Sequence, residues 1–448
     1  MRYLPIGSED ERRLLKAIGK PSVAELFEGI PEELRFEGRL PVPGPCSEVE
    51  IGREIGALAS LNAAPADYAW FLGAGAYRHD VSCIVDHILA RAEFATAYTP
   101  YQPEVAQGTL QAIFEFQSLV CQLTGCEVAN ASVYDGPSAM AEAALMALRL
   151  DPGRRTLLVS RSLHPHTRAI IETNTRNLGV TLRDLPPDAT GRIDPSALGS
   201  MLDGQASAVL LQSPNFFGVI EDVGAISKTA HDRGALVAVS VLEPVSLGVV
   251  APPGQLGADI VTGEAMTFAS SPSFGGPAVG FFATREKFVR NLPGRLCGET
   301  VDRDGKRGFV LTLSTREQHI RRERATSNIC TNQGLVMLAA TVGMCLYGKS
   351  GIREMALRNL TYGEELKRRL FASRRYAPLF SGPTFNEIAV QGPKRASDVL
   401  AALRDRGVVA GPGLAPYFPD RPDAFLVTVT ERNTLDEIGK LVSALESL

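Results

Sequence analysis

Short apolar runs alternate with helical patterns between residues 105 and 285, and no other feature of the sequence constrains the fold as strongly. The runs at 156–160, 206–214 and 235–241 have the length of strands and are too short for buried helices. The segments between them carry the periodic apolar positions of amphipathic helices, as in 222–234. Helices that alternate with apolar strands predict βαβ units and an α/β fold with a mostly parallel sheet.

The regions on either side of this alternation have a different character. Residues 1–70 hold helical patterns broken by Pro and Gly, which predict an N-terminal helical arm. Residues 71–325 make up the predicted large α/β domain. Residues 326–448 begin with two long helical patterns and end in the order strand–helix–strand–helix, which predicts a small C-terminal α+β domain.

The bulk composition excludes several classes of protein. With 448 residues and a net charge of −4, the chain lacks the basic surface that binding to nucleic acid requires. We find no apolar stretch with the length of a membrane span or the pattern of a signal peptide, so we expect no membrane partner. The seven cysteines are scattered and show no metal-binding spacing, so we expect mostly buried, reduced thiols, no metal site and a cytoplasmic protein.

Residues 257–285 read as a strand, a loop rich in Ser and Gly, and a second strand. In a large class of α/β enzymes a lysine at this place holds pyridoxal 5'-phosphate as a Schiff base. Here no lysine lies between Lys228 and Lys287, and the expected position is near Met266 and Thr267. Neither of these side chains can form a Schiff base, so the covalent anchor is missing.

The cofactor also needs an acid beside its pyridinium nitrogen, and that acid should lie on the strand 235–241. This strand contains no Asp or Glu, and Glu243 lies beyond its end. Ser240 can form a hydrogen bond there but cannot supply a charge. Both electronically essential groups are therefore absent, and the chain should not run the cofactor's chemistry by itself.

Two weaker features of a cofactor pocket remain. The helix that begins at Gly136 and includes Ser138 offers free N–H groups and a favourable dipole for a phosphate, but Asp135 beside it would repel an anion. His164 follows a strand at the sheet edge where ligands bind, and its ring could stack on a cofactor. An ordinary capped helix and a capping or core histidine are the competing interpretations.

Four longer stretches are more specific than any of these positions. They are FLGAGAYRHDVSCIVDHILARAEFATAYTPYQPEVAQGTLQAIFEFQ (71–117), NASVYDGPSAMAEA (130–143), LPGRLCGETVD (292–302) and GFVLTLSTREQHIRRERATSNICTNQ (308–333). With them the chain resembles, over essentially its whole length, glycine decarboxylase, the P-protein of the glycine cleavage system, in the α subunit of its split two-chain form. The resemblance implies the aspartate-aminotransferase-like fold of PLP-dependent transferases of fold type I.

The resemblance also implies what each chain contributes. A related β subunit carries the lysine, its acid partner and pyridoxal 5'-phosphate, and the two chains assemble as an α2β2 heterotetramer. Together they decarboxylate glycine and transfer its aminomethyl group to the lipoyl group of H-protein. By this comparison Ser240 replaces the pyridinium-pairing Asp, Met266 or Thr267 replaces the lysine, and His164 matches the ring-stacking histidine. The present chain would bind no cofactor covalently and would be inactive alone.

The resemblance further implies that residues 96–104 reach the active site of the β subunit. Prolines stiffen this segment and its two tyrosines offer flat rings with hydroxyl tips, which suits an interface. The residues concerned are Tyr98, Thr99, Pro100, Tyr101, Gln102 and Glu104. The competing interpretation is a Pro-rich surface turn with core tyrosines.

A basic run at 314–328 has two interpretations as well. The spacing of Glu317 and Arg321 predicts a solvated helix with a salt bridge. Alternatively, Arg321 and Arg324 order a loop at the subunit interface or attract an acidic carrier protein. Arg295 and Glu299 are further candidates for such interface or loop contacts.

An alternative from another functional class is a free-standing protein with this fold that binds a metabolite and regulates another protein. A self-sufficient homodimer with its own ligand would favour it. Purification together with a homologous, lysine-bearing chain would favour the subunit of an enzyme.

Overall fold

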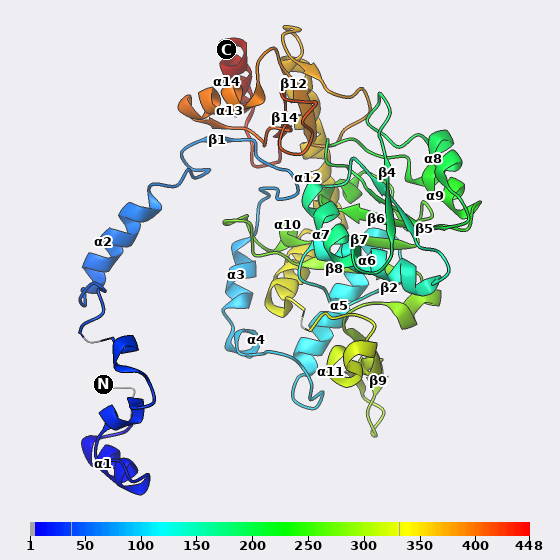
Figure 1. The fold of residues 1–448 in the computed structure, drawn as a ribbon. Helices are drawn as coiled ribbons and strands as arrows, with labels where there is room; N and C mark the ends of the chain where they lie inside the picture. Colours follow the sequence, from blue (N-terminus) through cyan, green and yellow to red (C-terminus); the bar gives the residue numbers. More distant parts are fainter. Residues whose placement is uncertain (1–4, 37, 331) are drawn as a thin grey trace. The chain divides into compact units, whose positions relative to one another are not determined.

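The structure, a computed structural model, describes residues 5–36, 38–330 and 332–448. The chain divides into two compact units, Met1–Ala63 and Ala64–Leu448, and the second contains all strands of the described residues (Figure 1). The first boundary therefore falls several residues before the predicted end of the arm at residue 70.

The described residues of the N-terminal unit form no hydrophobic core of their own. Its helical elements are α1 (Ser8–Ala17), η1 (Val23–Phe27), η2 (Glu32–Leu34) and α2 (Glu48–Ala59). Among its described residues only Leu15 is buried, while apolar side chains such as Ile51 and Ile55 of α2 are exposed. Ser47 caps α2, because its hydroxyl accepts the N–H of Glu50 and the Glu50 carboxylate accepts the N–H of Ser47.

A seven-stranded sheet organises the second unit. Its strand order is β2-β8-β7-β6-β5-β3-β4, and the five strands from β7 to β4 run parallel. At the other edge β8 is antiparallel to β7, and β2 is antiparallel to β8. The prediction of a mostly parallel sheet is confirmed. The strands are β2 (Val128–Ala129), β3 (Thr156–Ser160), β4 (Thr181–Leu185), β5 (Ala206–Gln212), β6 (Leu236–Val241), β7 (Ile260–Glu264) and β8 (Gly280–Thr284).

Helices cover both faces of this sheet, because its central strands are buried on both sides. In β5, Ala208 and Leu210 pack toward α6, whereas Val209 and Leu211 pack into the cluster that contains α5. Helices α6 (Gly136–Leu150) and α7 (Pro165–Thr175) lie on one face (Figure 1). The other face is covered by α5 (Gln107–Thr124), α8 (Pro195–Met201), α9 (Val223–His231) and α12 (Gly334–Leu370).

Helix α12 is interrupted, as the two separate helical patterns in its sequence predicted. Gly348 has φ 56° and ψ −174°, so the helical path breaks there. Within the described residues α12 is the one helix whose length and composition would allow it to cross a membrane. The segment before the break is too short for a span, and Met337, Ala340 and Met344 pack into the core, so we interpret it as a core helix.

The C-terminal region has its own small sheet and core. The strands β11 (Ala377–Pro378), β12 (Glu387–Gln391) and β14 (Ala424–Thr428) pair antiparallel, with α13 (Ala396–Asp405) and α14 (Leu435–Glu446) packed on them. The predicted order strand–helix–strand–helix is confirmed. Near the start of the unit, β1 (Ala69–Trp70) pairs parallel with β13 (Val408–Val409), which ties residues 69–70 to this region.

Short elements complete the second unit. A hairpin joins β9 (Leu296–Val301) to β10 (Arg307–Thr312). The remaining helical turns are α3 (Cys83–Leu89), α4 (Ala92–Ala95), η3 (Pro244–Gly248), α10 (Met266–Ala269), η4 (Glu286–Asn291), η5 (Ser314–Arg316), α11 (Gln318–Arg321) and η6 (Arg322–Arg324).

The cysteines are reduced but less buried than predicted. All seven are free thiols, and the exposed ones are Cys46, Cys83, Cys330 and Cys345. The expectation that most are buried is wrong, because these four lie in loops or on outward helix faces. Cys126 and Cys297 are buried, and burial raises the pKa of Cys126 to about 12.

Candidate functional site: a dismantled cofactor pocket and an exposed aromatic segment

A cavity of about 430 Å³ lies at the carboxyl ends of the parallel strands. This is the edge of an open α/β sheet where ligands bind. Most of its lining residues follow strands or begin helices of the large sheet. They are Ala74, Gly75, Ala76, Asp135, Pro137, His164, His166, Phe216, Leu242, Glu264, Met266, Gly275, Ala278, Pro412 and Tyr417. Of the predicted vestigial positions, His164 lines the cavity, while Gly136 and Ser138 are chain neighbours of the lining residues Asp135 and Pro137.

His164 serves as the cap of α7. Its Nδ1 accepts the backbone N–H of His166 at 3.1 Å, and its Nε2 donates to the carbonyl of Ala74 at 3.0 Å. These two bonds define the neutral tautomer with the proton on Nε2. Burial lowers the pKa of His164 to about 4, so the ring stays uncharged. Of the two interpretations of this residue, the structure favours the helix-capping histidine.

The N-terminus of α6, where a phosphate would bind, is occupied by carboxylates of the chain itself. Asp135 caps the helix, because its Oδ1 accepts the N–H of Ser138 at 2.7 Å. Glu264 reaches the same turn from the end of β7, and its Oε2 accepts the N–H of Gly136 at 3.1 Å. Asp135 could be recognised from the sequence, whereas Glu264 could not, because it lies far from α6 in the chain.

Ser240 is the residue predicted to replace the acid partner of the cofactor, and Leu242 lies two residues further along the chain. Ser240 lies on β6, and its hydroxyl is fully buried without a hydrogen-bond partner among the described residues. Leu242 packs against the start of α6, since a methyl group added at Gly136 would lie 2.8 Å from Leu242 Cδ2. The wall above β6 is therefore apolar and offers no charge to a pyridinium nitrogen.

The position of the missing lysine is buried as well. Met266 and Thr267 begin the short helix α10, and both are buried. Of the two, Met266 lines the cavity. The lysine and the acid are absent and carboxylates occupy the phosphate position, so the residues present do not fit pyridoxal 5'-phosphate.

The predicted interface segment 96–104 presents its aromatic side chains to the surface. Tyr98 is 84% exposed and Tyr101 is 59% exposed, so the interpretation as core tyrosines is wrong. Pro100 is buried and fixes the segment, while Thr99 is half-buried and the side chains of Gln102 and Glu104 are exposed. The structure therefore places two anchored tyrosines outward without a partner in this chain for most of their ring surface.

Arg295 holds Tyr101 in place. This arginine is only 5% exposed, and its guanidinium lies 5.5 Å from the centre of the Tyr101 ring. Its Nη2 donates to the Tyr101 hydroxyl at 3.3 Å and to the carbonyl of Cys330 at 2.9 Å. Its Nε forms an ion pair with Glu317 at 3.5 Å. Two groups predicted separately, the segment 96–104 and Arg295, thus belong to one contact.

Two other predicted interface candidates, Glu299 and Arg324, are not part of this contact. The Glu299 carboxylate pairs with Arg307 across the β9–β10 hairpin at 2.8 Å. Arg324 pairs with its neighbour Glu323, and both side chains are exposed. The predicted helix with a Glu317–Arg321 salt bridge is wrong: α11 ends after one turn because Arg322 has φ 50°, and the carboxylate of Glu317 pairs with Arg295 instead.

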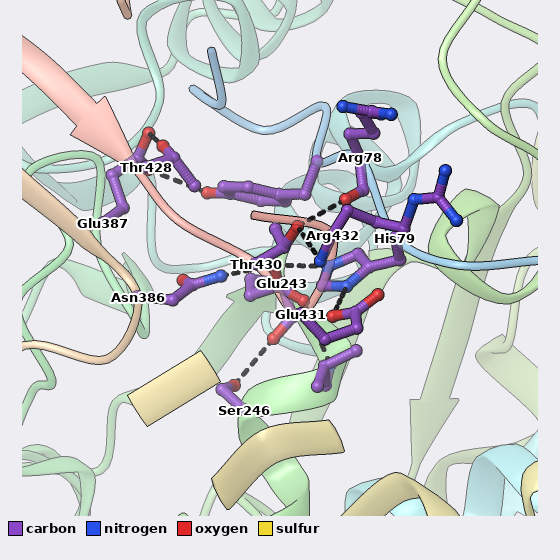
Figure 2. Close-up of polar contacts among 12 residues, drawn as sticks. Arg78, His79, Glu243, Ser246, Asn386, Glu387, Thr428, Thr430, Glu431 and Arg432 are labelled. Atoms are coloured by element: carbon purple, nitrogen blue, oxygen red, sulfur yellow. Dashed lines mark hydrogen bonds and ion pairs between the residues drawn. The ribbon is translucent and has the colours of Figure 1, made fainter. Parts of the chain in front are cut away.

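A buried polar cluster, which could not be predicted from the sequence, surrounds the ring of His79 (Figure 2). It adjoins the cavity lining, because its member Glu387 accepts the N–H of Ala74. Figure 2 shows the ring of His79 between two carboxylates: its Nε2 is 2.9 Å from Glu243 Oε2 and its Nδ1 is 2.9 Å from Glu431 Oε2. Asn386 donates to the same oxygen of Glu243 at 3.2 Å. Burial in itself lowers the pKa of His79, but the two carboxylates outweigh it and raise the pKa to about 10.

Glu387 extends this cluster toward the cavity. Its carboxylate accepts the N–H of Ala74 at 2.7 Å and the hydroxyls of Thr428 at 2.7 Å and Tyr77 at 2.9 Å. Burial raises the pKa of Glu387 to about 7, against the opposing hydrogen bonds. The cluster joins the segment 74–80 to the C-terminal sheet and so fixes one wall of the cavity. Among the described residues, no group of three or more His, Cys, Asp or Glu side chains could hold a metal ion.

The fold and the residues of the cavity together indicate a class of protein. The fold is that of PLP-dependent transferases of fold type I, and the residues that line its cavity do not fit pyridoxal 5'-phosphate. The likeness extends to distant solved structures: a sphingosine-1-phosphate lyase of Burkholderia pseudomallei matches over 93% of both chains with TM-score 0.67 at 16% identity, a similarity in fold alone.

Closer comparisons identify the family. Residues 1–445 match the glycine cleavage system P-protein family, and the chain belongs to it. A crystal structure of glycine decarboxylase (P-protein) of the glycine cleavage system, in an inhibitor-bound form, matches over 100% of both chains with TM-score 0.87 and 39% identity. The resemblance seen in the sequence is thereby confirmed.

Relatives of the same length show which form of the family this chain represents. A relative from Thermomicrobium roseum is 47% identical over 445 residues, 99% of each chain. Another from Bacillus cereus (strain AH187) is 46% identical over 447 residues, covering 100% of this chain and 99% of the relative. Both are named probable glycine dehydrogenase (decarboxylating) subunit 1.

Proposed function

We propose that this chain is the α subunit of a glycine dehydrogenase (decarboxylating), and that a homologous β subunit holds pyridoxal 5'-phosphate. The observation that carries the proposal is the dismantled pocket in a chain that matches subunit 1 over its full length. With Met266, Ser240 and Glu264 at the three cofactor positions, the decarboxylation of glycine needs another chain. A free-standing metabolite-binding protein is not favoured, because the full-length relatives carry the name of an enzyme subunit.

The contribution of this chain is the completion of the partner's active site. Tyr98 and Tyr101 offer two exposed aromatic rings from a segment that the buried Pro100 anchors. Arg295 restricts Tyr101 further by a stacking contact and a hydrogen bond, so the ring is pre-organised before a partner binds. In this proposal the two tyrosines shape the substrate entrance of the β subunit and exclude water from it.

The finer features of the assembly follow from the same proposal. The two chains form an α2β2 heterotetramer, and lipoylated H-protein receives the aminomethyl group derived from glycine. The complex works in the cytoplasm, where the seven free thiols of this chain would stay reduced.

Reconstitution tests the proposal directly. The chain, its β homologue and their mixture are assayed for glycine-dependent release of CO2 in the presence of lipoylated H-protein. We expect activity from the mixture and none from this chain alone, and light scattering should give the mass of two chains of each kind. Turnover by this chain alone would contradict the proposal. So would an absorbance of bound pyridoxal 5'-phosphate that borohydride makes permanent in this chain.

A further inference from the structure

The first turn of α6 has no free N–H group left for a ligand. Gly136 donates to Glu264, and Pro137 has no N–H. Ser138 donates to the side chain of Asp135, and Ala139 donates to its backbone carbonyl. Helix N-termini bind phosphate through N–H groups of this kind. In this helix every one of them is already used within the chain.

Glu264 accepts hydrogen bonds from the kind of N–H groups that would bind an anion. Its side chain is buried, and while Oε2 accepts the N–H of Gly136, Oε1 accepts the N–H groups of Met266 at 3.0 Å and Val279 at 2.8 Å. Three backbone N–H groups from three segments therefore converge on one carboxylate. Such a set of donors is a built anion site, and the carboxyl group of Glu264 occupies it. Burial raises the pKa of Glu264, and the hydrogen bonds from the three N–H groups lower it.

The charge and shape of the cavity also disfavour the binding of a phosphate. Its lining contains the carboxyl groups of Asp135 and Glu264 and neither Lys nor Arg. His164 is neutral, so its ring cannot compensate the charge of a phosphate. The side chain of Leu242 occupies the space beside Gly136, and it also lies close to Gly75. A phosphate at this helix would meet two carboxylates and no vacant donor.

We propose that Glu264 is an internal ligand that permanently occupies the phosphate position of the former cofactor site, so that this pocket rejects phosphate-bearing molecules whether or not a lysine is present. The absence of the lysine removes only the covalent bond. Glu264 removes the non-covalent binding site for the phosphate group. Without Glu264, that site could still bind the phosphate of a cofactor after the loss of the lysine. The inference rests on the geometry of this chain and does not depend on the proposed function.

The test replaces Glu264 by Ala in the full-length chain. Inorganic phosphate and pyridoxal 5'-phosphate are titrated into wild type and E264A by calorimetry, with equilibrium dialysis as a second readout. We expect no saturable binding by wild type. E264A should bind both probes at least about tenfold more tightly, because the N–H groups of Gly136, Met266 and Val279 become available.

Glu221→Ala is the matched control. Glu221 is also buried and accepts hydrogen bonds from the backbone N–H of Ile193 and from Asn215, each at 2.9 Å, but it does not line the cavity. E221A should not gain phosphate binding. A gain in E221A equal to that in E264A would show a general effect of removing a buried carboxylate and would overturn the proposal.

A second variant keeps the test decisive if E264A does not fold. Glu264→Gln retains the shape of the side chain and an oxygen for the N–H groups of Met266 and Val279, while it removes the charge. E264Q should gain phosphate binding, although less than E264A. Wild type that binds phosphate as tightly as the folded variants, or a folded variant without any gain, would show that Glu264 does not exclude phosphate.

Discussion

The former cofactor pocket and the segment 96–104 lie in one chain and have opposite characters. In the pocket, the N–H groups that could bind a phosphate already donate to acceptors of the same chain, as Gly136 does to Glu264. In the segment two tyrosines extend from the surface, and the buried Arg295 fixes the ring of Tyr101. By our inference the first region excludes phosphate, whereas the second exposes aromatic rings that a partner could cover.

This contrast shows which kind of change should affect which property. Groups in and beside the closed pocket satisfy one another, so changing them should lower the stability of the chain. The exposed tyrosines satisfy little within the chain, so changing them should lower the activity of the assembled enzyme. Variants that fail to separate stability from activity in this way would break the comparison.

The largest effect is expected at His79. His79→Ala leaves the carboxylates of Glu243 and Glu431 buried without their shared partner, which should lower the free energy of unfolding by about 3–5 kcal/mol. Urea denaturation followed by circular dichroism measures it. His231→Ala is the control, because His231 pairs with Asp259 at 2.7 Å but is partly exposed, and the loss should stay below about 1 kcal/mol. Equal losses in the two variants would contradict the role of the buried cluster.

The same residue should make stability depend on pH. The pKa of His79 is raised from 6.5 to about 10 in the folded chain, so its contribution is fully present below pH 6.5 and is lost as the pH rises through 10. The free energy of unfolding should therefore fall by up to about 1.4 kcal/mol per pH unit within this window. His79→Gln should flatten this slope, and an unchanged slope would exclude His79 as its source.

A smaller loss of stability is expected at Glu264. Replacing it by Ala leaves the N–H groups of Gly136, Met266 and Val279 without their acceptor, which should cost about 2–4 kcal/mol. Asp135→Asn should cost much less, because Asn also caps helices well. Thermal unfolding of both variants provides the comparison. A larger loss in D135N than in E264A would contradict the idea that Glu264 is the main internal ligand.

The exposed segment should respond in activity alone. Tyr101→Phe or Tyr98→Phe should lower turnover of the reconstituted enzyme severalfold while αβ assembly, measured by light scattering, changes less. Tyr417→Phe is the matched control, since its hydroxyl contacts His166 beside the closed pocket, and it should turn over like wild type. Wild-type turnover in both Y98F and Y101F would show that the hydroxyl groups of the segment do not contribute to activity and that the segment serves only in packing.

The smallest effect is expected in the basic run. Arg324→Ala should change stability by less than about 0.5 kcal/mol, because its ion pair with Glu323 at 3.8 Å is fully solvated. Activity with H-protein should also stay unchanged. A rise in the concentration of H-protein needed for half-maximal turnover would revive the interpretation that this run attracts the carrier.

The fold and the loss of the cofactor lysine could be read from the sequence because both are local signals. Strands and helices follow from periodicity within short windows, and an absent lysine is visible wherever it should stand. The exposed tyrosines required the structure, because a Pro-rich segment with two aromatics suits a surface and a core equally well. The predicted salt bridge of the basic run was wrong because Glu317 pairs with Arg295 in the tertiary structure, in place of Arg321, the local partner that its spacing suggested.

The sequence by itself determined that this chain has the architecture of a cofactor enzyme without the cofactor's anchor and acid. Met266, Thr267 and Ser240 can be read directly at the positions where these two groups are expected. Only the tertiary structure decided that the phosphate position is filled from within. Glu264 meets Gly136 across 128 residues of sequence, and the contact depends on the side-by-side placement of a strand end and a helix start. Sequence patterns record local periodicity, whereas the partner of a buried charge depends on the fold as a whole.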